Sequence, residues 1–562
     1  MHDLVIENAR IVDGTGAASF HGSLAVAGGR IVSISRETRP GVRAQERIDA
    51  EGLAVAPGFV DPHTHYDAQV AWDPLLTCSP WHGVTSVMMG NCGVGVAPVR
   101  ADAREVAMWD LVNVEAIPFD VMEQALEWRW EGYPDYLDAL AARGLGINVA
   151  AMVPLTPLRQ FVLGEAAFDR AANDEERAEM ARLLREAMDA GAFGFSTTLL
   201  NNHVGYGGRP IACRQADEAE LGALCDVLRE TGRGAIEAAV AQTDLSTLSD
   251  EELAVLRLFA ERSGQPVTYL ALINRPEDPK SYLNVVDRLG DLLGARRVVP
   301  QIACRPLKQQ FDMRNPFLLG ALTAFRPVFN KTREEQAALY ADADFRRAVK
   351  EELPQRLIME DMVGRIRLID ASSEAGRAQV ASGRTMAEVG AEDGRSPIDV
   401  LLDLAAEDAD LMIDVAVANF EPEGTRNLLQ DGRFLIGLGD GGAHVAQLCD
   451  ACYPTYLLGR WVRERQAISL EEGVRQLTSV PADFFGIADR GRLAEGLAAD
   501  LVLFDPDKVD AHDPEFVSDL PGGARRMVSR AEGIHATIVN GRTLMRDGEH
   551  MGELPGQVLR SA

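Results

Sequence analysis

Cysteine is scarce in this sequence, with 7 cysteines in 562 residues. Their number is odd and they are scattered, which excludes the disulfide framework of a small secreted protein and favours a reducing compartment. Cys449 and Cys452 have the CxxC spacing of zinc and redox motifs, but no second pair accompanies them. We therefore interpret these two residues as core thiols.

Long apolar runs and an excess of positive charge are also missing. The sequence has no stretch of about 18 or more apolar residues, and its first residues, MHDLVIENARIVDG, do not resemble a signal peptide. We therefore expect a soluble, cytoplasmic protein. The formal net charge of −29 argues against nucleic acid or an anionic membrane as a partner. A small substrate remains compatible with this charge, because a pocket can be locally positive.

Both ends of the chain alternate apolar and polar residues, as β-strands do. At the N-terminal end this pattern covers residues 3–14 and 23–34, with Gly28-Gly29 as a tight turn, and at the C-terminal end it covers 499–507 and 535–549. We predict that residues 1–56 and 487–562 together form one small β-sandwich domain. A chain of 562 residues also exceeds the usual size of a single domain, so a larger unit should lie between these ends.

The middle of the chain contains eight short apolar runs, separated by loops and amphipathic helical stretches. The runs cover residues 58–65, 84–92, 147–154, 191–200, 234–242, 266–273, 298–306 and 434–442. Because buried parallel strands have continuous apolar runs, eight βα units predict an α/β protein with a (β/α)₈ TIM barrel over residues 57–486. The alternative is a doubly wound open sheet, but no GxGxxG motif follows the first run.

The last two runs are separated by too many residues for one crossover helix. Segments such as EEQAALYADADFRRAVKEELPQRL within this interval have a helical pattern. We predict a helical insertion over residues 307–395, before the last barrel strand. It would either cover the barrel mouth as part of a substrate lid or provide contacts in a homo-oligomer.

The chain has 10 histidines, and two of them, His63 and His65, stand one residue apart at the end of the first run. Residues i and i+2 of a strand face the same side, and functional groups of a barrel gather at the carboxyl ends of its strands. Two imidazoles in this position can share a divalent ion such as zinc. A pair of ordinary loop histidines is the alternative.

Asp440 and Cys92 are further candidate metal ligands. Asp440 ends the last run, and strands one and eight adjoin in a closed barrel, so its carboxylate can lie next to the histidines and act as a general base. Cys92 ends the second run, where a thiolate would suit zinc. The alternatives are a turn aspartate before Gly441 and a small buried cysteine under a glycine turn.

Several longer strings resemble the D-aminoacylase (N-acyl-D-amino-acid deacylase) family of the amidohydrolase superfamily. They include GFVDPHTHYDAQVAWDP, HGVTSVMMGNCGVGVAP, WEGYPDYLDAL, DRGRLAEGLAADLVLFDPDKV and IHATIVNGRTLMRDGE, and they are spread over most of the chain. The resemblance implies a (β/α)₈ barrel, a small β-sandwich formed by both termini, and zinc-dependent hydrolysis of an amide. It also implies that Cys92 corresponds to the metal-binding cysteine of the family.

The sequence departs from this family at three strands. Members usually have histidines at the ends of strands five and six, but here the runs GAIEAAVAQ and PVTYLALI contain none. Glu237 falls near the first of these positions and Tyr269 near the second. In strand three, PLTPLR replaces a motif that often has a histidine before leucine and arginine, and runs four and five have no lysine to bridge two metals.

These departures favour one zinc ion rather than two. We expect the ion to be held by His63, His65 and Asp440, with Cys92 or Glu237 as an auxiliary ligand. Arg305, His203, His444 and Arg159 are candidate substrate-binding residues. Arg305 could pair with a substrate carboxylate and His444 could donate to an oxyanion, although each of the four could instead have a purely structural role.

The sequence therefore predicts a metal-dependent amidohydrolase that cleaves a C–N amide bond of an N-acyl (D-)amino acid or a related small amide. Metal-activated water would attack the carbonyl, with Asp440 as general base. A second interpretation keeps the barrel and metal but assigns a cyclic amide or imide, a deamination or an amide-forming reaction. A third is a barrel without catalysis that serves as a binding subunit.

Overall fold

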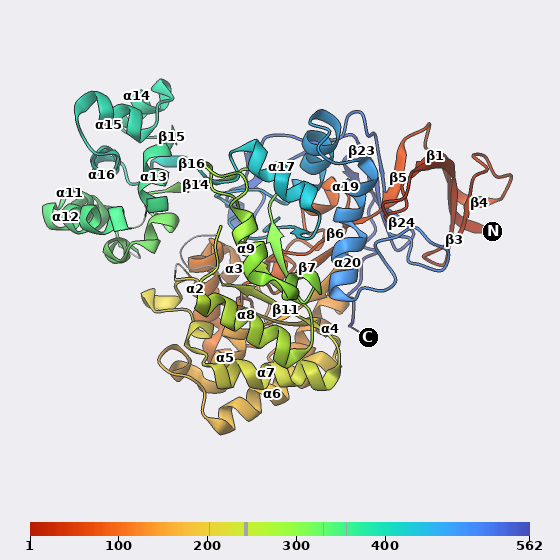
Figure 1. Cartoon of the computed structure of the whole chain (residues 1–562), viewed down its shortest axis with the longest axis horizontal. Helices are drawn as coiled ribbons and strands as arrows, with labels where there is room; N and C mark the ends of the chain where they lie inside the picture. Colours follow the sequence, from red (N-terminus) through yellow and green to blue (C-terminus); the bar gives the residue numbers. More distant parts are fainter. Residues whose placement is uncertain (202, 241–245, 330, 356, 562) are drawn as a thin grey trace.

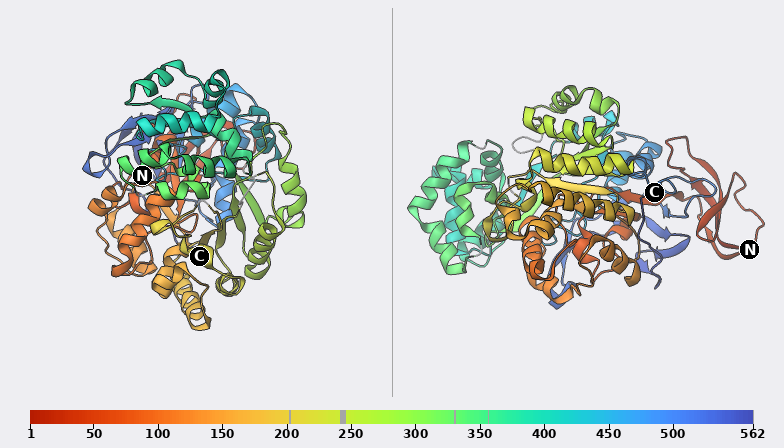
Figure 2. Two further views of the ribbon diagram at one scale, coloured as in Figure 1. Left: turned by 90° about the vertical axis from the view of Figure 1, so that its left-hand side faces the viewer. Right: turned by 90° about the horizontal axis from the view of Figure 1, so that it is seen from below.

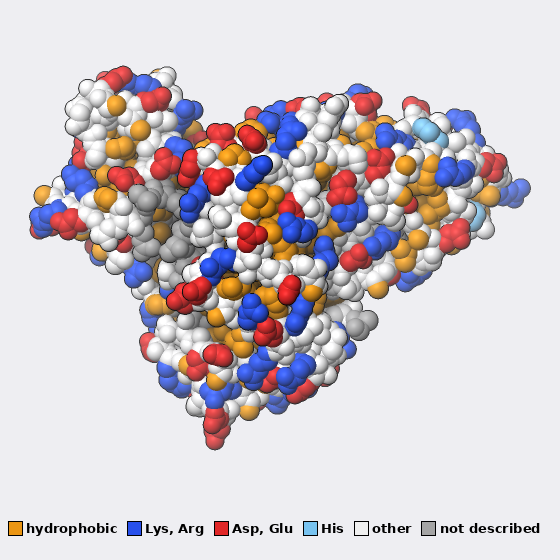
Figure 3. Space-filling view, in the orientation of Figure 1, with side chains coloured by type: hydrophobic (Ala, Val, Ile, Leu, Met, Phe, Trp, Pro, Cys, Tyr) orange, Lys and Arg blue, Asp and Glu red, His pale blue; other side chains and the backbone are white. Residues whose placement is uncertain are grey.

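The computed structural model describes residues 1–562 except 202, 241–245, 330, 356 and 562. A central α/β unit lies between a sheet formed by both chain ends and a mostly helical lobe (Figures 1 and 2). No helix among the described residues has the length and apolarity needed to cross a bilayer. On the face shown in Figure 3, acidic and basic side chains are interspersed over all three parts.

Parallel strands form the centre of the molecule, and they fall within the eight predicted runs. They are β6 (Phe59–Asp61), β7 (Val84–Met89), β8 (Asn148–Ala151), β9 (Val153–Pro154), β10 (Gly194–Thr198), β11 (Ala235–Ala239), β12 (Val267–Leu270), β13 (Val298–Ile302) and β17 (Leu435–Ile436). The end of the fifth run, residues 241–242, lies outside the described residues.

The pairing of these strands follows the order of a (β/α)₈ barrel. One sheet has the order β6-β7-β8 and the other β9-β10-β11-β12-β13-β17, and all their pairs are parallel. Strands β8 and β9 are consecutive pieces of one run, and a parallel bridge between Thr64 and Gly441 joins the first segment to the last. Strand eight therefore lies next to strand one. This is the arrangement that the sequence prediction needs for Asp440 to lie beside His63 and His65.

The strands are buried on both sides because helices cover the ring. The helix α6 (Asp174–Asp189) is an example of how the sequence defines such a cover. Asn173 and Glu176 form a capping box at its start, and Met180, Leu184, Ala187 and Met188 make up its buried face. The helices α5 (Leu155–Leu163), α7 (Glu218–Thr231) and α8 (Asp250–Ser263) lie on the same side of the molecule (Figure 1).

The two chain ends meet in one sheet. Its nine strands are β1 (His2–Ile11), β2 (Phe20–Ala27), β3 (Arg30–Ser35), β4 (Ala44–Asp49), β5 (Ala54–Pro57), β18 (Leu501–Phe504), β23 (Ile534–Val539), β24 (Arg542–Arg546) and β25 (Glu549–His550). The antiparallel pair β5–β18 joins the two halves, and residues from both ends share one apolar core. Eight of these strands pair along one path and β4 pairs with β1 beside it, so both chain ends contribute to one sheet, while the two layers of a sandwich stay a prediction.

The lobe before the last barrel strand has its own apolar core, with members from Phe311 to Val415. It contains helices α11 (Arg333–Ala341), α12 (Ala343–Glu352), α13 (Leu357–Arg365), α14 (Glu374–Ser382), α15 (Met386–Asp393) and α16 (Pro397–Glu407). A three-stranded antiparallel sheet, β14 (Leu307–Asp312), β16 (Met412–Ala418) and β15 (Arg367–Asp370), connects it to the barrel. The lobe thus extends beyond the predicted boundary at 395, because the outgoing strand β14 must pair with a returning strand.

Candidate metal centre

The end of the first barrel strand places His63 and His65 on one face. Thr64, between them, donates through Oγ1 to the Met88 carbonyl at 2.8 Å and so faces the second strand. The backbone N–H of His65 donates to the Gly441 carbonyl at 2.7 Å, which ties the segment to strand eight. Both imidazoles are therefore fixed between two neighbouring strands and point toward the barrel axis.

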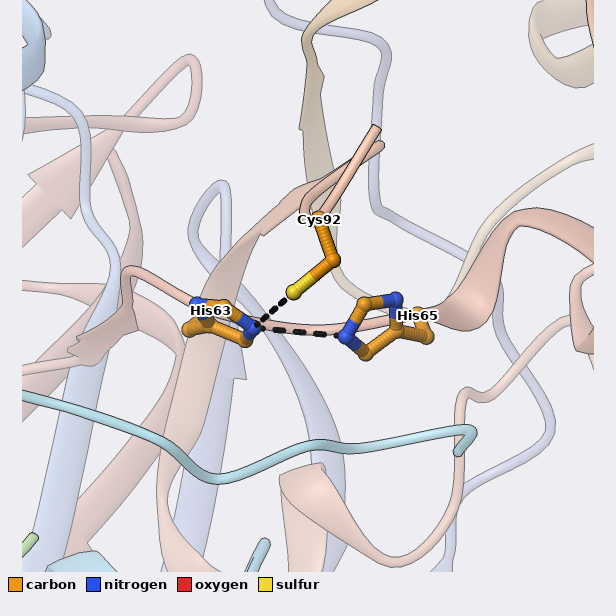
Figure 4. A group of neighbouring side chains, drawn as sticks. All are labelled: His63, His65 and Cys92. Carbon is orange, nitrogen blue, oxygen red and sulfur yellow. Dashed lines mark hydrogen bonds between the residues drawn. The ribbon is translucent and has the colours of Figure 1, made fainter. Parts of the chain in front are cut away.

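The two imidazoles and the Cys92 thiol converge on one point (Figure 4). The Nε2 atoms of His63 and His65 are 3.3 Å apart, and Cys92 Sγ is 3.5 Å from His63 Nε2. All three donor atoms lie within 4.8 Å of one another, and all three residues are buried. Two nitrogens and one sulfur at these separations are a donor set that zinc favours.

The outer nitrogens of the two rings show which atoms are free to bind a cation. His63 Nδ1 is 3.0 Å from the Gln301 side-chain carbonyl oxygen, an acceptor, so Nδ1 carries the proton and Nε2 presents a lone pair. His65 Nδ1 faces Glu115 Oε1 at 3.4 Å, which favours the same tautomer. Two lone pairs facing each other at 3.3 Å repel unless a cation lies between them, so these residues fit a bound zinc ion.

Cys92 is held in place by a tight glycine turn. Its φ angle is +55°, in the left-handed region that non-glycine residues rarely adopt outside special sites. Its backbone N–H donates to Glu237 Oε2 at 2.7 Å. Burial, followed by the nearby carboxylates Glu237 and Glu115, raises the pKa of the Cys92 thiol well above its usual range. A cation at this point would offset that effect and hold the thiolate.

Asp440 lies next to the three convergent donors. Its Oδ1 is 3.4 Å from His63 Nε2, and its side chain is 24% exposed. It is not a member of the set whose donor atoms all lie within 4.8 Å of one another. Its φ angle is +43°. Burial and the nearby Asp450 raise the pKa of the Asp440 carboxyl to about 7.

The opposite side of the mouth, on strands five and six, carries different groups. Glu237 on β11 is buried, and its Oε1 has no hydrogen-bond partner among the described residues. Its pKa is raised to about 8, mainly by burial. On β12 the residue paired with Glu237 is Thr268, so Thr268 faces the same interior. Tyr269 faces the other way, toward Glu252 of α8, and therefore does not take the place of a ligand.

The structure brings together His444, His203 and a residue that the sequence did not reveal, Glu115. Glu115 ends helix α2 (Arg104–Glu115), and its Oε2 is 3.7 Å from His444 Nε2. His203 is buried nearby, and its pKa falls to about 3 through burial and then through repulsion by His444. The Glu115 carboxylate therefore lies between His444 and His65.

Arg305 lies at the mouth but is already engaged. Its guanidinium donates to the Cys449 carbonyl at 3.0 Å, contacts Cys452 Sγ, and lies 3.3 Å from Asp450 Oδ1. Among the described residues, its Nη2 atom has no hydrogen-bond acceptor. Arg305 therefore keeps the N–H groups of Nη2, on a side chain that is 16% exposed, for a further anion.

The substrate-binding prediction for Arg159 is wrong. Its side chain is fully buried in an ion pair with Glu220 of α7, and it also donates to the carbonyls of Ala167 and Arg170. The guanidinium therefore joins α5 and α7 in the helical layer and cannot contact a ligand at the mouth.

Gln301 and Glu115 face the outer nitrogens of His63 and His65. The sequence could have revealed the first of these residues but not the second. Gln301 is the one polar residue within the run VVPQIA, and it lies two positions after Val299, which faces the interior. This alternation could have identified it as an inward group near the mouth. Glu115 gives no such signal, because it lies on a helix after a long loop and reaches the site only through the fold.

A parallel barrel with imidazole and thiolate donors at the carboxyl ends of its strands defines a class of metal-dependent barrel hydrolases. The chain matches the amidohydrolase family over residues 46–545, and it belongs to this family. It is therefore a hydrolase acting on carbon–nitrogen bonds other than peptide bonds.

Characterised relatives resemble the chain over nearly its whole length. A D-aminoacylase from Alcaligenes xylosoxydans xylosoxydans is 29% identical, covering 99% of this chain and 97% of its own. An N-acyl-D-aspartate deacylase from the same organism is 30% identical, covering 99% and 95%.

Two solved structures share the fold. A D-aminoacylase has a TM-score of 0.68 at 22% identity, covering 100% of both chains. An N-acyl-D-glutamate deacylase from Bordetella bronchiseptica, complexed with zinc and a phosphonate inhibitor, has a TM-score of 0.66 at 25% identity, covering 100% of this chain and 99% of its own.

Proposed function

We propose that this protein is a zinc-dependent deacylase that releases a D-amino acid from an N-acyl-D-amino acid or from a closely related small amide. The observation that carries the proposal is the convergence of His63, His65 and Cys92 beside the carboxylate of Asp440. The similarity to D-aminoacylase and to N-acyl-D-aspartate deacylase supports the choice of substrate class.

One zinc ion would be held by His63 Nε2, His65 Nε2 and Cys92 Sγ. Glu237 is a candidate auxiliary ligand, because its Oε1 is buried and has no hydrogen-bond partner among the described residues. When bound, zinc polarises the carbonyl of an amide and makes hydroxide available near neutral pH. The zinc complex of the related N-acyl-D-glutamate deacylase supports this choice of metal.

Asp440 would act as the general base. Its Oδ1 lies beside the ligands on the more exposed side, where a substrate amide would enter, and can take the proton of the attacking water. Oδ1 would then return this proton to the leaving amine. Its pKa of about 7 is the value without an ion, and a neighbouring cation would lower it, so Asp440 would be ionised at neutral pH.

Substrate recognition would use the basic side chains of the mouth. Arg305 could bind the substrate carboxylate through its unused Nη2, and His444 could donate to the oxygen that becomes negative during attack. His203, buried near His444, would complete the wall of the substrate site. The lobe over residues 307–418 follows strand seven directly and could cover the bound substrate.

A cyclic amide or imide is the second candidate substrate class. The feature that favours it is the replacement of the two family histidines by Glu237 and by a strand-six interior that offers Thr268. The side of the mouth opposite His63, His65 and Cys92 therefore differs from that of the family. This altered side could accommodate a ring.

The zinc-loaded protein should be tested with N-acetyl-D-amino acids, their L-enantiomers, and cyclic substrates such as hydantoin and dihydrouracil. We expect release of free D-amino acid, loss of activity on chelation, and recovery with zinc. Turnover of the cyclic compounds alone would replace the proposal by the second candidate. If all substrates remain unchanged in zinc-loaded protein, the catalytic proposal is wrong and a binding role is favoured.

A further inference from the structure

We propose that Glu115 is a positioning residue that holds the metal ligand His65 and the mouth histidine His444 with the two oxygens of one carboxylate. This inference deepens the proposed function and rests on it, because it assigns a role to Glu115 in loading the metal and in binding substrate. Glu115 itself touches neither the predicted ion nor the substrate.

The carboxylate of Glu115 lies between the two imidazoles. Its Oε1 is 3.4 Å from His65 Nδ1, and its Oε2 is 3.7 Å from His444 Nε2. The side chain is 3% exposed, so water cannot replace these partners easily. A buried carboxylate that faces two nitrogen donors has a geometry suited to holding both rings.

The Nδ1 atoms of the two predicted ligand histidines differ in their hydrogen-bond partners. This difference indicates the role of Glu115. His63 Nδ1 already has the Gln301 oxygen at 3.0 Å. His65 Nδ1 is buried and has no hydrogen-bond partner among the described residues. Leaving it without one would be costly, and Glu115 Oε1 needs to approach by only a few tenths of an ångström to accept its proton. A cation on the opposite Nε2 would strengthen that bond.

The main chain places Glu115 where it can serve both rings. The backbone N–H of His444 donates to the Glu115 carbonyl at 2.5 Å, so the end of α2 is tied to the loop that follows strand eight. The next residue, Ala116, and His444 itself have φ angles of +51° and +50°, which turn both chains sharply at this contact. Glu115 therefore joins the loops after strands two and eight beside the ligand of strand one.

This arrangement makes two effects depend on one residue. The loss of Glu115 would free the His65 ring to rotate away from the ion, which weakens zinc binding. It would also release His444, which weakens substrate binding even when the ion is present. The loss of His444 alone would affect only the second process, because the contact from Glu115 to His65 would remain.

The test compares Glu115→Ala, Glu115→Gln and His444→Asn with the control Glu105→Gln. Glu105 lies on the same helix α2 but is exposed, so its variant makes the same substitution away from the site. Zinc affinity of the metal-free proteins is measured by competition with a chromogenic chelator. The values of kcat and KM for N-acetyl-D-amino acids are measured at saturating zinc, and circular dichroism checks folding.

We expect Glu115→Ala to lower zinc affinity about 10- to 100-fold and to raise KM at saturating zinc. Glu115→Gln keeps an acceptor for His65 and should lose less zinc affinity than the alanine variant. His444→Asn should raise KM and leave zinc affinity within about 2-fold of the unchanged protein, as should Glu105→Gln.

The inference is overturned if folded Glu115→Ala binds zinc as tightly as Glu105→Gln. It is also overturned if His444→Asn lowers zinc affinity as much as Glu115→Ala, because His444 would then act on the metal independently. If the unchanged protein binds zinc but hydrolyses no substrate, the proposed function fails while the zinc measurements still decide the role of Glu115 in metal loading. No zinc binding by the unchanged protein would overturn both.

Discussion

The two sides of the barrel mouth carry different chemistry. On the side of strands one, two and eight, His63, His65 and Cys92 converge within 4.8 Å, and Asp440 lies beside them. On the side of strands five and six, the inward groups are the carboxyl of Glu237 and the hydroxyl of Thr268. The first side brings three metal-ligand donors together, whereas the second offers a single carboxyl group beside a hydroxyl, so the difference favours one ion.

The largest effect should follow from removing a metal-ligand donor on the side of strands one, two and eight. His63→Ala removes a convergent donor, and we expect zinc affinity and kcat/KM to fall by more than the roughly 10- to 100-fold loss that follows removal of a ligand's supporting partner. His21→Ala, an exposed histidine of the terminal sheet, is the matched control. Equal zinc content and activity in the two variants would contradict the assignment of the ligands.

Asp440→Asn tests the base separately from the metal. The amide cannot accept a proton, so we expect kcat to fall about 10²- to 10⁴-fold while zinc affinity changes much less. Zinc content by elemental analysis and steady-state kinetics on the same preparation measure both quantities. A variant that loses its zinc would show instead that Asp440 is a principal ligand, as the sequence predicted.

The second side of the mouth should respond more weakly. Glu237→Gln replaces a buried carboxyl group near the predicted ion by an amide, and we expect zinc affinity to fall about 10-fold, at the lower end of the effects of neighbouring groups. Thr268→Val, at the paired position on strand six, should leave zinc affinity within about 2-fold. If Thr268→Val weakens zinc binding as much as Glu237→Gln, the two strands contribute equally and the comparison fails.

The smallest effect concerns Asp110, the second buried carboxylate of α2. Burial raises its pKa to about 6 in the folded protein, above the usual value of about 3.9. The folded state therefore binds this proton more tightly than the unfolded state, and the stabilisation is present below about pH 4 and lost as the pH rises to about 6. Asp110→Asn has no such proton. The apparent melting temperature of this variant should therefore rise relative to that of the unchanged protein as the pH increases from 4 to 6. A constant difference over this range would contradict the shift.

Much of the barrel could be predicted from the sequence, because buried parallel strands produce continuous apolar runs and all eight runs contain described strands. The HxH pair could be predicted because alternation along a strand is local. Glu115 and the buried pair Arg159–Glu220 could not, since each depends on how a helix packs against distant segments. The pairing of β14 with β16 could not be predicted for the same reason, because it joins residues that are far apart in the chain.

The most direct test of the central claim is a crystal structure of the zinc-loaded protein with anomalous scattering recorded at the zinc edge. The account predicts one peak, about 2.0–2.1 Å from His63 Nε2 and His65 Nε2 and about 2.3 Å from Cys92 Sγ. A peak that contacts none of these atoms, or no peak in crystals grown with excess zinc, would contradict it.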